Sequence, residues 1–313
     1  MYILGLDIGG TKCAAVTGSL DDGRITLIKK QSIETDHSIS AYEMLARIFD
    51  MADGILDKSP DAVGISCGGP LDSIRGVILS PPNLPGWDNI EIVRLAGEHF
   101  NAPVYLQNDA NACAVAEWKF GAGRGFSNIA FLTFGTGLGA GLILNGRLFE
   151  GTNGNAGELG HIRLEKDGPE GYGKAGSFEG FCSGGGIAKL GRAFAEEAIK
   201  NGVTPLYANS GVDGITAKSI AQAAIAGDET AIKVYNTSGR YLGRGLSILI
   251  DILNPERIII GGVFMRSHKL LWESAEEELK KEALSQSLDV CKIVPSELGE
   301  NIGDYGALAT ALL

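Results

Sequence analysis

A glycine-rich segment near the start of the chain has the residue types of a phosphate-binding turn. Asp7-Ile8-Gly9-Gly10-Thr11-Lys12 lies between two apolar runs, which predicts a tight turn between two strands. Glycine lets backbone N–H groups approach phosphate oxygens, and Thr11 and Lys12 add donors. Asp7, at the strand end, can hold a magnesium ion through water. The segment matches neither the P-loop nor the dinucleotide-binding pattern, and a simple hairpin turn remains an alternative.

Two later segments repeat the combination of a strand and a glycine turn. Residues 134–139 suit a second phosphate clamp, built from Gly135, Thr136 and Gly137. Residues 258–262 end in Gly261 and Gly262, where a nucleoside could pack against bare backbone. Each segment is equally well explained by a strand that ends in a turn.

One aspartate stands where a strand is expected to meet a helix. In Asn108-Asp109-Ala110, the Asp109 carboxylate could act as a general base that accepts a hydroxyl proton. Aspartate is also a favoured residue at helix N-caps, so a purely structural role is the competing interpretation.

Three further polar side chains could bind the hydroxyl groups of a sugar. Glu158 and His161 lie three residues apart in Gly157-Glu158-Leu159-Gly160-His161, and Glu179 follows later. Two carboxylates and an imidazole offer a set of hydrogen-bonding groups for hydroxyls. The alternative is a pair of surface acids and a histidine with a structural partner.

Short strands and helices are expected around these residues. Each half of the chain begins with a strand, a glycine turn and a strand, which predicts two β-rich lobes with a boundary at the glycine-rich residues 121–125. The predicted strands are residues 3–6, 13–17, 25–33, 62–67, 104–107, 129–134, 140–144 and 257–260, and the predicted helices are residues 40–56, 110–120 and 304–313.

Length, charge and cysteine content narrow the class of protein. A chain of 313 residues is long enough for two lobes, and its net charge of −11 argues against binding to nucleic acid or an anionic membrane. The five cysteines form no CxxC pair, which is typical of reduced thiols in the cytoplasm. We expect neither a signal peptide nor a transmembrane segment.

Taken in order, the motifs resemble the ROK family, named for repressors, open reading frames and kinases. Each motif is weak by itself, but the series covers almost the whole chain. The matching segments are DIGGTK at 7–12, GGP at 68–70, PPNLPGW at 81–87, NDANA at 108–112, FGTGLGAG at 134–141, GELGH at 157–161 and IIIGG at 258–262.

The resemblance implies an α/β protein with the actin-like ATPase (ribonuclease H-like) fold, in which two lobes surround a central cleft. The expected lobes are a small N-terminal one of residues 1–120 plus 303–313 and a large C-terminal one of residues 121–302. Asp109 would be the base that activates the sugar hydroxyl. The residues implied to bind sugar are Gly69, Asn83, Asn108, Asp109, Glu158, His161 and Glu179. Those implied to bind ATP are Gly9, Gly10, Thr11, Lys12, Gly135, Thr136, Gly137, Gly261 and Gly262.

The chain departs from the family in a segment that usually binds structural zinc. Family members use the histidine that matches His161 and three cysteines, but Gly171, Gly173 and Ser177 stand where thiolates would be. Only Cys182 is nearby, so a four-ligand site cannot be assembled here and we predict no zinc site. Family repressors also carry a DNA-binding module before the first glycine turn, whereas only six residues precede Asp7 here.

We therefore expect a cytoplasmic enzyme that uses ATP and Mg²⁺ to phosphorylate a hexose, by default glucose at its 6-hydroxyl. N-acetylmannosamine, N-acetylglucosamine, fructose, allose and β-glucosides are alternative substrates within the family, which also suggests a homodimer. The competing classes are a catalytically silent, sugar-sensing regulator and an actin-like filament protein. Asp7, Thr11 and Asp109 together argue against the regulator, and the sugar-facing residues argue against the filament protein.

Overall fold

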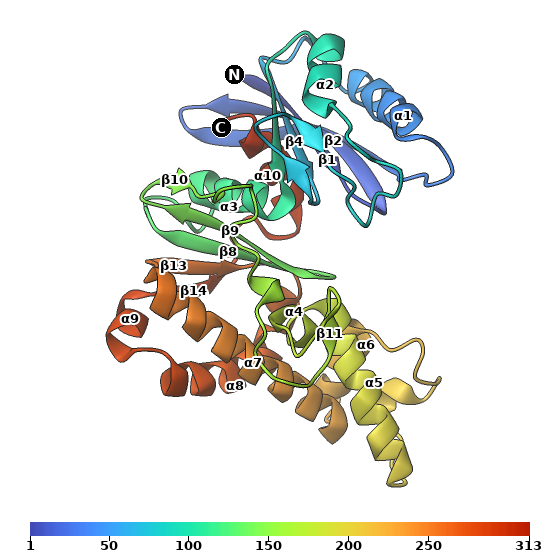
Figure 1. The fold of residues 1–313 in the computed structure, drawn as a ribbon, viewed down its shortest axis with the longest axis vertical. Helices are drawn as coiled ribbons and strands as arrows, with labels where there is room; N and C mark the ends of the chain where they lie inside the picture. Colours follow the sequence, from blue (N-terminus) through green and yellow to red (C-terminus); the bar gives the residue numbers. More distant parts are fainter. The chain divides into compact units, whose positions relative to one another are not determined.

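The computed structural model describes residues 1–313, which form two compact units (Figure 1). Unit 1 comprises Met1–Phe131, Gly141–Ala156 and Ser296–Leu313, and unit 2 comprises Leu132–Ala140 and Gly157–Pro295. The division into a small and a large lobe at residues 120 and 303 stays a prediction. No helix in either unit has the length and apolar composition needed to cross a bilayer.

Unit 1 is built on a five-stranded mixed sheet. In the strand order β3-β2-β1-β4-β7, the first three strands are antiparallel and the last three are parallel. A two-stranded sheet, β5 (Leu71–Asp72) with β6 (Val77–Ile78), lies in the connection after β4. The strands of the main sheet are β1 Tyr2–Ile8, β2 Lys12–Asp21, β3 Arg24–Glu34, β4 Ala62–Cys67 and β7 Val104–Asn108.

Side chains alternate between the two faces of this sheet, and the helices divide accordingly. Helix α10 (Ile302–Thr310) packs on β1 and β4, where Leu308 joins Ile3 and Val16 in a buried cluster. The approach is close: an added Cβ at Gly64 would lie 2.0 Å from the Ala307 carbonyl oxygen. Because side chains on a strand alternate with a period of two, Asp7 lies on the same face as Ile3, toward α10.

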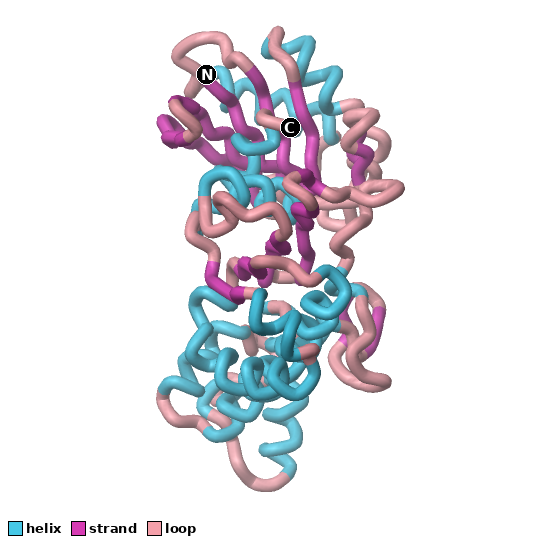
Figure 2. The backbone as a smooth tube through the Cα atoms, turned by 90° about the vertical axis from the view of Figure 1, so that its left-hand side faces the viewer, coloured by secondary structure: helices cyan, strands magenta, loops and turns pink.

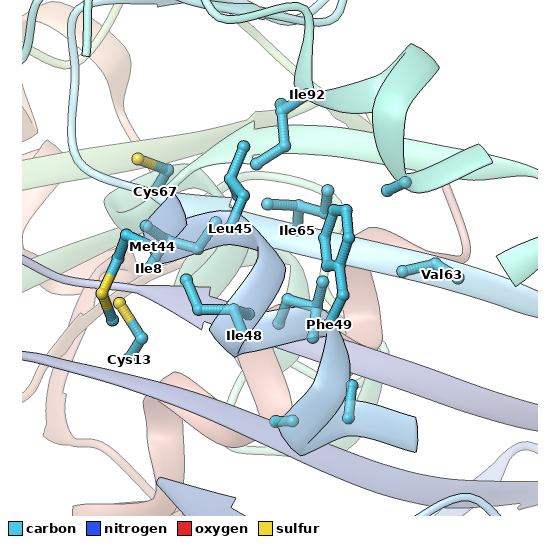
Figure 3. Close-up of a cluster of buried hydrophobic side chains, with 14 of the residues drawn as sticks. Ile8, Cys13, Met44, Leu45, Ile48, Phe49, Val63, Ile65, Cys67 and Ile92 are labelled. Atoms are coloured by element: carbon cyan, nitrogen blue, oxygen red, sulfur yellow. The ribbon is translucent and has the colours of Figure 1, made fainter. Parts of the chain in front are cut away.

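The opposite face of the sheet carries the main hydrophobic core of unit 1. Leu4, Leu6 and Ile8 pack there with α1 (Ala41–Asp53) and α2 (Ile92–Phe100). Figure 3 shows Leu45 and Phe49 of α1 beside Ile65 of β4, and Met44 of the same helix near Cys13 in the same cluster.

Helix α1 starts at a residue pair that is recognisable in the sequence. The Ser40 hydroxyl accepts a hydrogen bond from the Glu43 backbone N–H, and the Glu43 carboxylate accepts one from the Ser40 N–H. This capping box satisfies two backbone donors that the helix cannot satisfy itself. The apolar residues of α1 then recur on one face of the helix, as the predicted helix over residues 40–56 requires.

A second five-stranded sheet has the order β10-β9-β8-β13-β14, and helices make up most of unit 2 (Figure 2). Its strands are β8 Ile129–Phe134, β9 Leu138–Leu144, β10 Arg147–Leu148, β13 Arg257–Ile260 and β14 Lys292–Pro295. The hairpin β11 (Glu170–Gly171) with β12 (Lys174–Ala175) lies apart from this sheet. The helices of unit 2 are α4 Phe178–Phe181, α5 Gly184–Lys200, α6 Ala217–Ile225, α7 Glu229–Leu253, α8 Val263–Glu282 and α9 Ser285–Val290.

Candidate active site

The first glycine turn joins β1 to β2 and is braced from two sides. Its own strands close it, with the Gly9 N–H donating to the Lys12 carbonyl at 3.2 Å. The Thr35 hydroxyl donates to the Gly9 carbonyl at 2.6 Å, and His37 Nε2 contacts the Gly10 carbonyl at 2.7 Å. Since a carbonyl can only accept, His37 carries a proton on Nε2. These bonds fix the turn, while Thr11 and Lys12 remain exposed.

Gly10 allows a second loop to lie directly against this turn. An added Cβ at Gly10 would be 2.3 Å from the Asn83 carbonyl oxygen, which is far below any normal contact. The loop that carries Asn83 is anchored by buried Leu84 and Trp87, and the Ser80 hydroxyl donates to the Asp88 carboxylate. Asn83 itself is exposed beside the turn.

Gly69 and Asn108 extend the same group of residues. An added Cβ at Gly68 would lie 3.3 Å from the Asn83 amide nitrogen, and one at Gly69 would lie 3.3 Å from the Asn108 amide nitrogen. The four sugar-binding candidates of unit 1, Gly69, Asn83, Asn108 and Asp109, therefore lie close to one another and to the first glycine turn.

Asp109 begins helix α3 (Asp109–Phe120), but it is not the N-cap residue. The N-cap is Asn108, whose side chain accepts a hydrogen bond from the Ala110 N–H at 3.0 Å. The Asp109 carboxylate accepts a bond from the same N–H at 2.8 Å, and its side chain is otherwise exposed. Since Asn108 occupies the capping position, the structural explanation for Asp109 is weaker than the sequence alone suggests.

The surroundings of Asp109 affect its ionisation in opposite directions. Desolvation by the surrounding protein raises the pKa of the carboxyl, and the backbone N–H groups of Ala110 and Asp109 lower it. The side chain is still reached by water, which limits the cost of its charge. Asp109 therefore has the geometry of an exposed base held at the end of a helix.

Asp7 lies in a more strongly perturbed position at the end of β1. Burial raises its pKa from 3.8 to about 6, with smaller increases from the carboxylates of Asp109 and Asp304, while Lys30 and Lys12 oppose the increase. Asp304 is buried in the first turn of α10 and pairs with Lys30 at 2.6 Å. No sequence motif points to Asp304 or Lys30, because 274 residues separate them.

No group of three or more His, Cys, Asp or Glu side chains has the arrangement of a metal site. A magnesium ion nevertheless fits the donors near Asp7, because Mg²⁺ keeps several waters and often uses one carboxylate together with substrate phosphates. The partly buried Asp7 carboxylate makes no hydrogen bond within the protein, and four charged side chains, two aspartates and two lysines, act on its pKa.

The second glycine turn, in unit 2, is held by backbone groups. Its Gly135 N–H donates to the Gly137 carbonyl at 3.0 Å, and the N–H groups of Gly184 and Gly185 donate to the carbonyls of Gly135 and Thr136. The turn thus lies against the start of α5. Gly184 and Gly185 were not among the predicted site residues, although Ser183 followed by three glycines is a recognisable cap at a helix start.

Gly261 and Gly262 lie beside this second turn. The Gly261 N–H donates to the Leu132 carbonyl at 3.0 Å, and Gly262 has a positive φ of 68°. An added Cβ at Gly262 would be 2.1 Å from the Phe134 carbonyl oxygen, so only glycine fits. The two glycine segments of unit 2 that are candidates for nucleotide binding, residues 135–137 and 261–262, therefore lie next to each other.

Glu179 contacts the same turn. Its carboxylate accepts a hydrogen bond from the Leu138 N–H at 3.0 Å, and an added Cβ at Gly137 would lie 2.8 Å from it. Glu158 and His161 lie on the adjoining segment and are both exposed. That segment packs tightly on β9, where an added Cβ at Gly160 would lie 2.1 Å from the Leu138 carbonyl oxygen.

The sequence matches the profile of the ROK family over residues 3–312. The chain belongs to the ROK family. It is 32% identical to a glucokinase from Thermotoga maritima, over 98% of this chain and 96% of that protein. It is also 30% identical to a xylose repressor from Caldicellulosiruptor bescii, over 86% of this chain and 68% of that protein.

Among solved structures, this ROK protein is similar to a Streptomyces griseus ROK glucokinase in complex with glucose and AMPPNP. The two share 30% identity and a TM-score of 0.80, with 100% of this chain and 99% of that chain covered. The prediction of an α/β actin-like ATPase fold is confirmed. The individual site residues stay predictions.

The segment in which ROK proteins commonly bind zinc is held here by other contacts. Ser177 is fully buried and caps α4, with its hydroxyl 3.1 Å from the Gly180 N–H. Lys174 Nζ donates to the His161 carbonyl at 2.7 Å, and Lys189 Nζ donates to the Glu170 carbonyl at 2.6 Å. The absence of structural zinc itself stays a prediction.

Proposed function

We propose that this ROK protein is a sugar kinase that transfers the γ-phosphoryl group of ATP to the 6-hydroxyl of a hexose, with glucose as the first candidate. The observation that carries the proposal is the position of Asp109. Its exposed carboxylate stands at the start of α3, next to Asn108 and near Gly69 and Asn83, while Asn108 provides the N-cap. The similarity to glucokinases from two organisms supports the same reaction.

In this reaction, Asp109 orients the hydroxyl and takes its proton as the new O–P bond forms and the bond from the γ-phosphorus to the ADP oxygen breaks. Asn83, Asn108, Glu158, His161 and Glu179 would hydrogen-bond the sugar, and Gly69 would let it approach the backbone. The backbone N–H groups of the two glycine turns and Lys12 would hold the phosphates of ATP, with Gly261 and Gly262 beside the nucleoside.

Asp7 would hold the magnesium ion through water. When bound, Mg²⁺ neutralises charge on the phosphates. The remaining contribution of the chain is to position substrate and exclude water. Most of the expected rate enhancement would therefore come from positioning and electrostatics.

The similarity to a xylose repressor makes a second function testable: a sugar-sensing regulator without turnover. A coupled assay for ADP release, run over a panel of hexoses, N-acetylhexosamines and β-glucosides, separates the two. Hexose-dependent ADP release that is lost in Asp109→Asn supports the kinase. Sugar binding without ADP release from any member of the panel would contradict it.

We also propose a homodimer in the cytoplasm that does not bind nucleic acid, in keeping with the net charge of −11. Light scattering coupled to size exclusion measures the mass directly. A monomeric mass at micromolar concentration would contradict the dimer.

A further inference from the structure

A buried amide at the end of β7 contacts the segment that carries Asp109. Gln107 is 3% exposed, and its side-chain oxygen accepts hydrogen bonds from the Asn108 backbone N–H at 2.8 Å and from the Asn111 amide at 3.1 Å. A backbone N–H can only donate, so the Gln107 oxygen must face Asn108 and its NH₂ group must point the other way. The orientation of this amide is therefore determined by the backbone.

The NH₂ group of Gln107 points at a carboxylate. It donates to Glu150 Oε1 at 3.0 Å, and the Ser73 hydroxyl donates to the same oxygen at 2.8 Å. Glu150 forms no ion pair with a lysine or arginine. All of these residues belong to unit 1. A charged acceptor makes a stronger hydrogen bond than a neutral one, so Glu150 holds the Gln107 amide firmly in its orientation.

Asn111, which bonds to the Gln107 oxygen, is also buried. Asn111 is 2% exposed and donates its amide to Gln107, which leaves its own side-chain oxygen buried without a hydrogen-bond partner. A buried polar atom without a partner lowers the stability of the folded state, because it has lost its hydrogen bonds to water. The arrangement therefore does not optimise the stability of α3, and a role in positioning explains why it is present.

We propose that Glu150 and Gln107 are positioning residues, which hold the Asn108 backbone so that the Asp109 carboxylate is in the correct place for proton transfer. The proposal rests on the proposed function. Asn108 precedes Asp109 in the chain, and Asn111 follows Asp109 by two residues, so Gln107 bonds to the start of α3 on both sides of Asp109. A displacement of the base of about 1 Å can lower a rate about 100-fold.

The proposal can be tested by exchanging the amide of residue 107 and the carboxylate of residue 150. Gln107→Glu leaves an oxygen for Asn108 and Asn111 but sets two carboxylates against each other, so we expect kcat to fall about 100-fold. Gln107→Glu combined with Glu150→Gln restores the bond with the donor on residue 150, and kcat should return to within about threefold of the wild type, with the KM for ATP unchanged throughout. Ser73→Ala, which removes only the second donor to Glu150, should have a smaller effect than Gln107→Glu.

A second measurement does not depend on turnover. Hydrogen exchange of the Asn108 backbone amide should become at least about tenfold faster in Gln107→Glu and return to the wild-type rate in the double variant. If the wild type phosphorylates no sugar, the proposed function fails, and this exchange measurement still decides whether the pair holds Asn108. Wild-type exchange in Gln107→Glu would overturn the positioning role. So would a loss of kcat that the double variant does not restore, because that result indicates general damage to the fold.

Discussion

The two glycine turns share a sequence pattern, but their surroundings differ in kind. The first turn, in unit 1, is braced by the side chains of Thr35 and His37 and has Asp7 and Lys12 at its ends. The second, in unit 2, is held by backbone N–H groups of Gly184 and Gly185 and by one carboxylate, Glu179.

This difference indicates a division of labour. Beside the first turn, in unit 1, the carboxylates of Asp109 and Asp304 raise the pKa of Asp7, and Lys30 and Lys12 oppose the increase. We expect proton transfer and metal binding to depend on unit 1. The second turn offers fixed backbone geometry, so we expect it to contribute mainly to substrate binding. The following predictions test this division.

The largest expected difference is between the losses of kcat caused by changing Asp109 and by changing Glu179. Asp109→Asn removes the proposed base, so kcat should fall about 10²–10⁴-fold. Glu179→Gln keeps an oxygen that can accept the Leu138 N–H, so its kcat should stay within about tenfold and any larger effect should appear in KM. Steady-state kinetics with both substrates varied measures the two effects.

Asp22→Asn is the matched control for Asp109→Asn, because Asp22 is exposed in a turn with a positive φ that asparagine also adopts readily. It should leave the kinetics unchanged. Equal losses of kcat in Asp109→Asn and Glu179→Gln would refute the division of labour.

The second comparison is between the stabilities of alanine variants at one glycine of each turn, Gly10 and Gly135. Gly10→Ala drives a Cβ into the Asn83 carbonyl, and we expect destabilisation of about 1–3 kcal/mol together with a loss of activity. Gly135→Ala has space, since the nearest atom would be 3.9 Å away, and should change stability by less than about 0.5 kcal/mol. Urea unfolding of the proteins without ligand distinguishes them, and similar destabilisation by both variants would contradict the geometry.

The third test uses the raised pKa of Asp7. A carboxyl whose folded pKa exceeds its unfolded value destabilises the folded state as it ionises, so this contribution is absent below about pH 4 and complete above about pH 6. A change from 3.8 to about 6 corresponds to at most about 3 kcal/mol.

Asp7→Asn should therefore be more stable than the wild type at pH 7.5, equally stable near pH 4, and inactive. Thermal unfolding without magnesium, measured across this range, checks the first two results. An Asp7→Asn protein that is less stable at pH 7.5 would show that the Asp7 carboxylate stabilises the fold.

The smallest expected effect is that of chelation. Ser177, Lys174 and Lys189 hold the segment near His161 and Glu179, so treatment with a chelator followed by excess magnesium should restore full activity. Elemental analysis should find no stoichiometric zinc. About one tightly bound zinc ion per chain would contradict this prediction.

Much of the fold could be predicted because its signals are local. The strands over residues 62–67, 129–134 and 257–260 have the predicted bounds, and the strand, glycine turn and strand at the start of the chain lie where the pattern placed them. Alternating apolar residues predict a strand and glycine predicts a turn, and both signals depend only on residues within the segment itself. Predicted helix ends differ by up to three residues, as for α1, which ends at Asp53 rather than residue 56.

The sequence by itself determined the family, the turns and the candidate residues, because their order along the chain is specific. Only the tertiary structure decided which side chains meet. In the folded chain Asn108 is the N-cap of α3, and the Lys30–Asp304 pair lies near Asp7. The Gln107 amide donates to Glu150. The physical reason is that burial and electrostatic interaction depend on distance in space, and contacts across 43 or 274 residues leave no periodic signal in a single sequence.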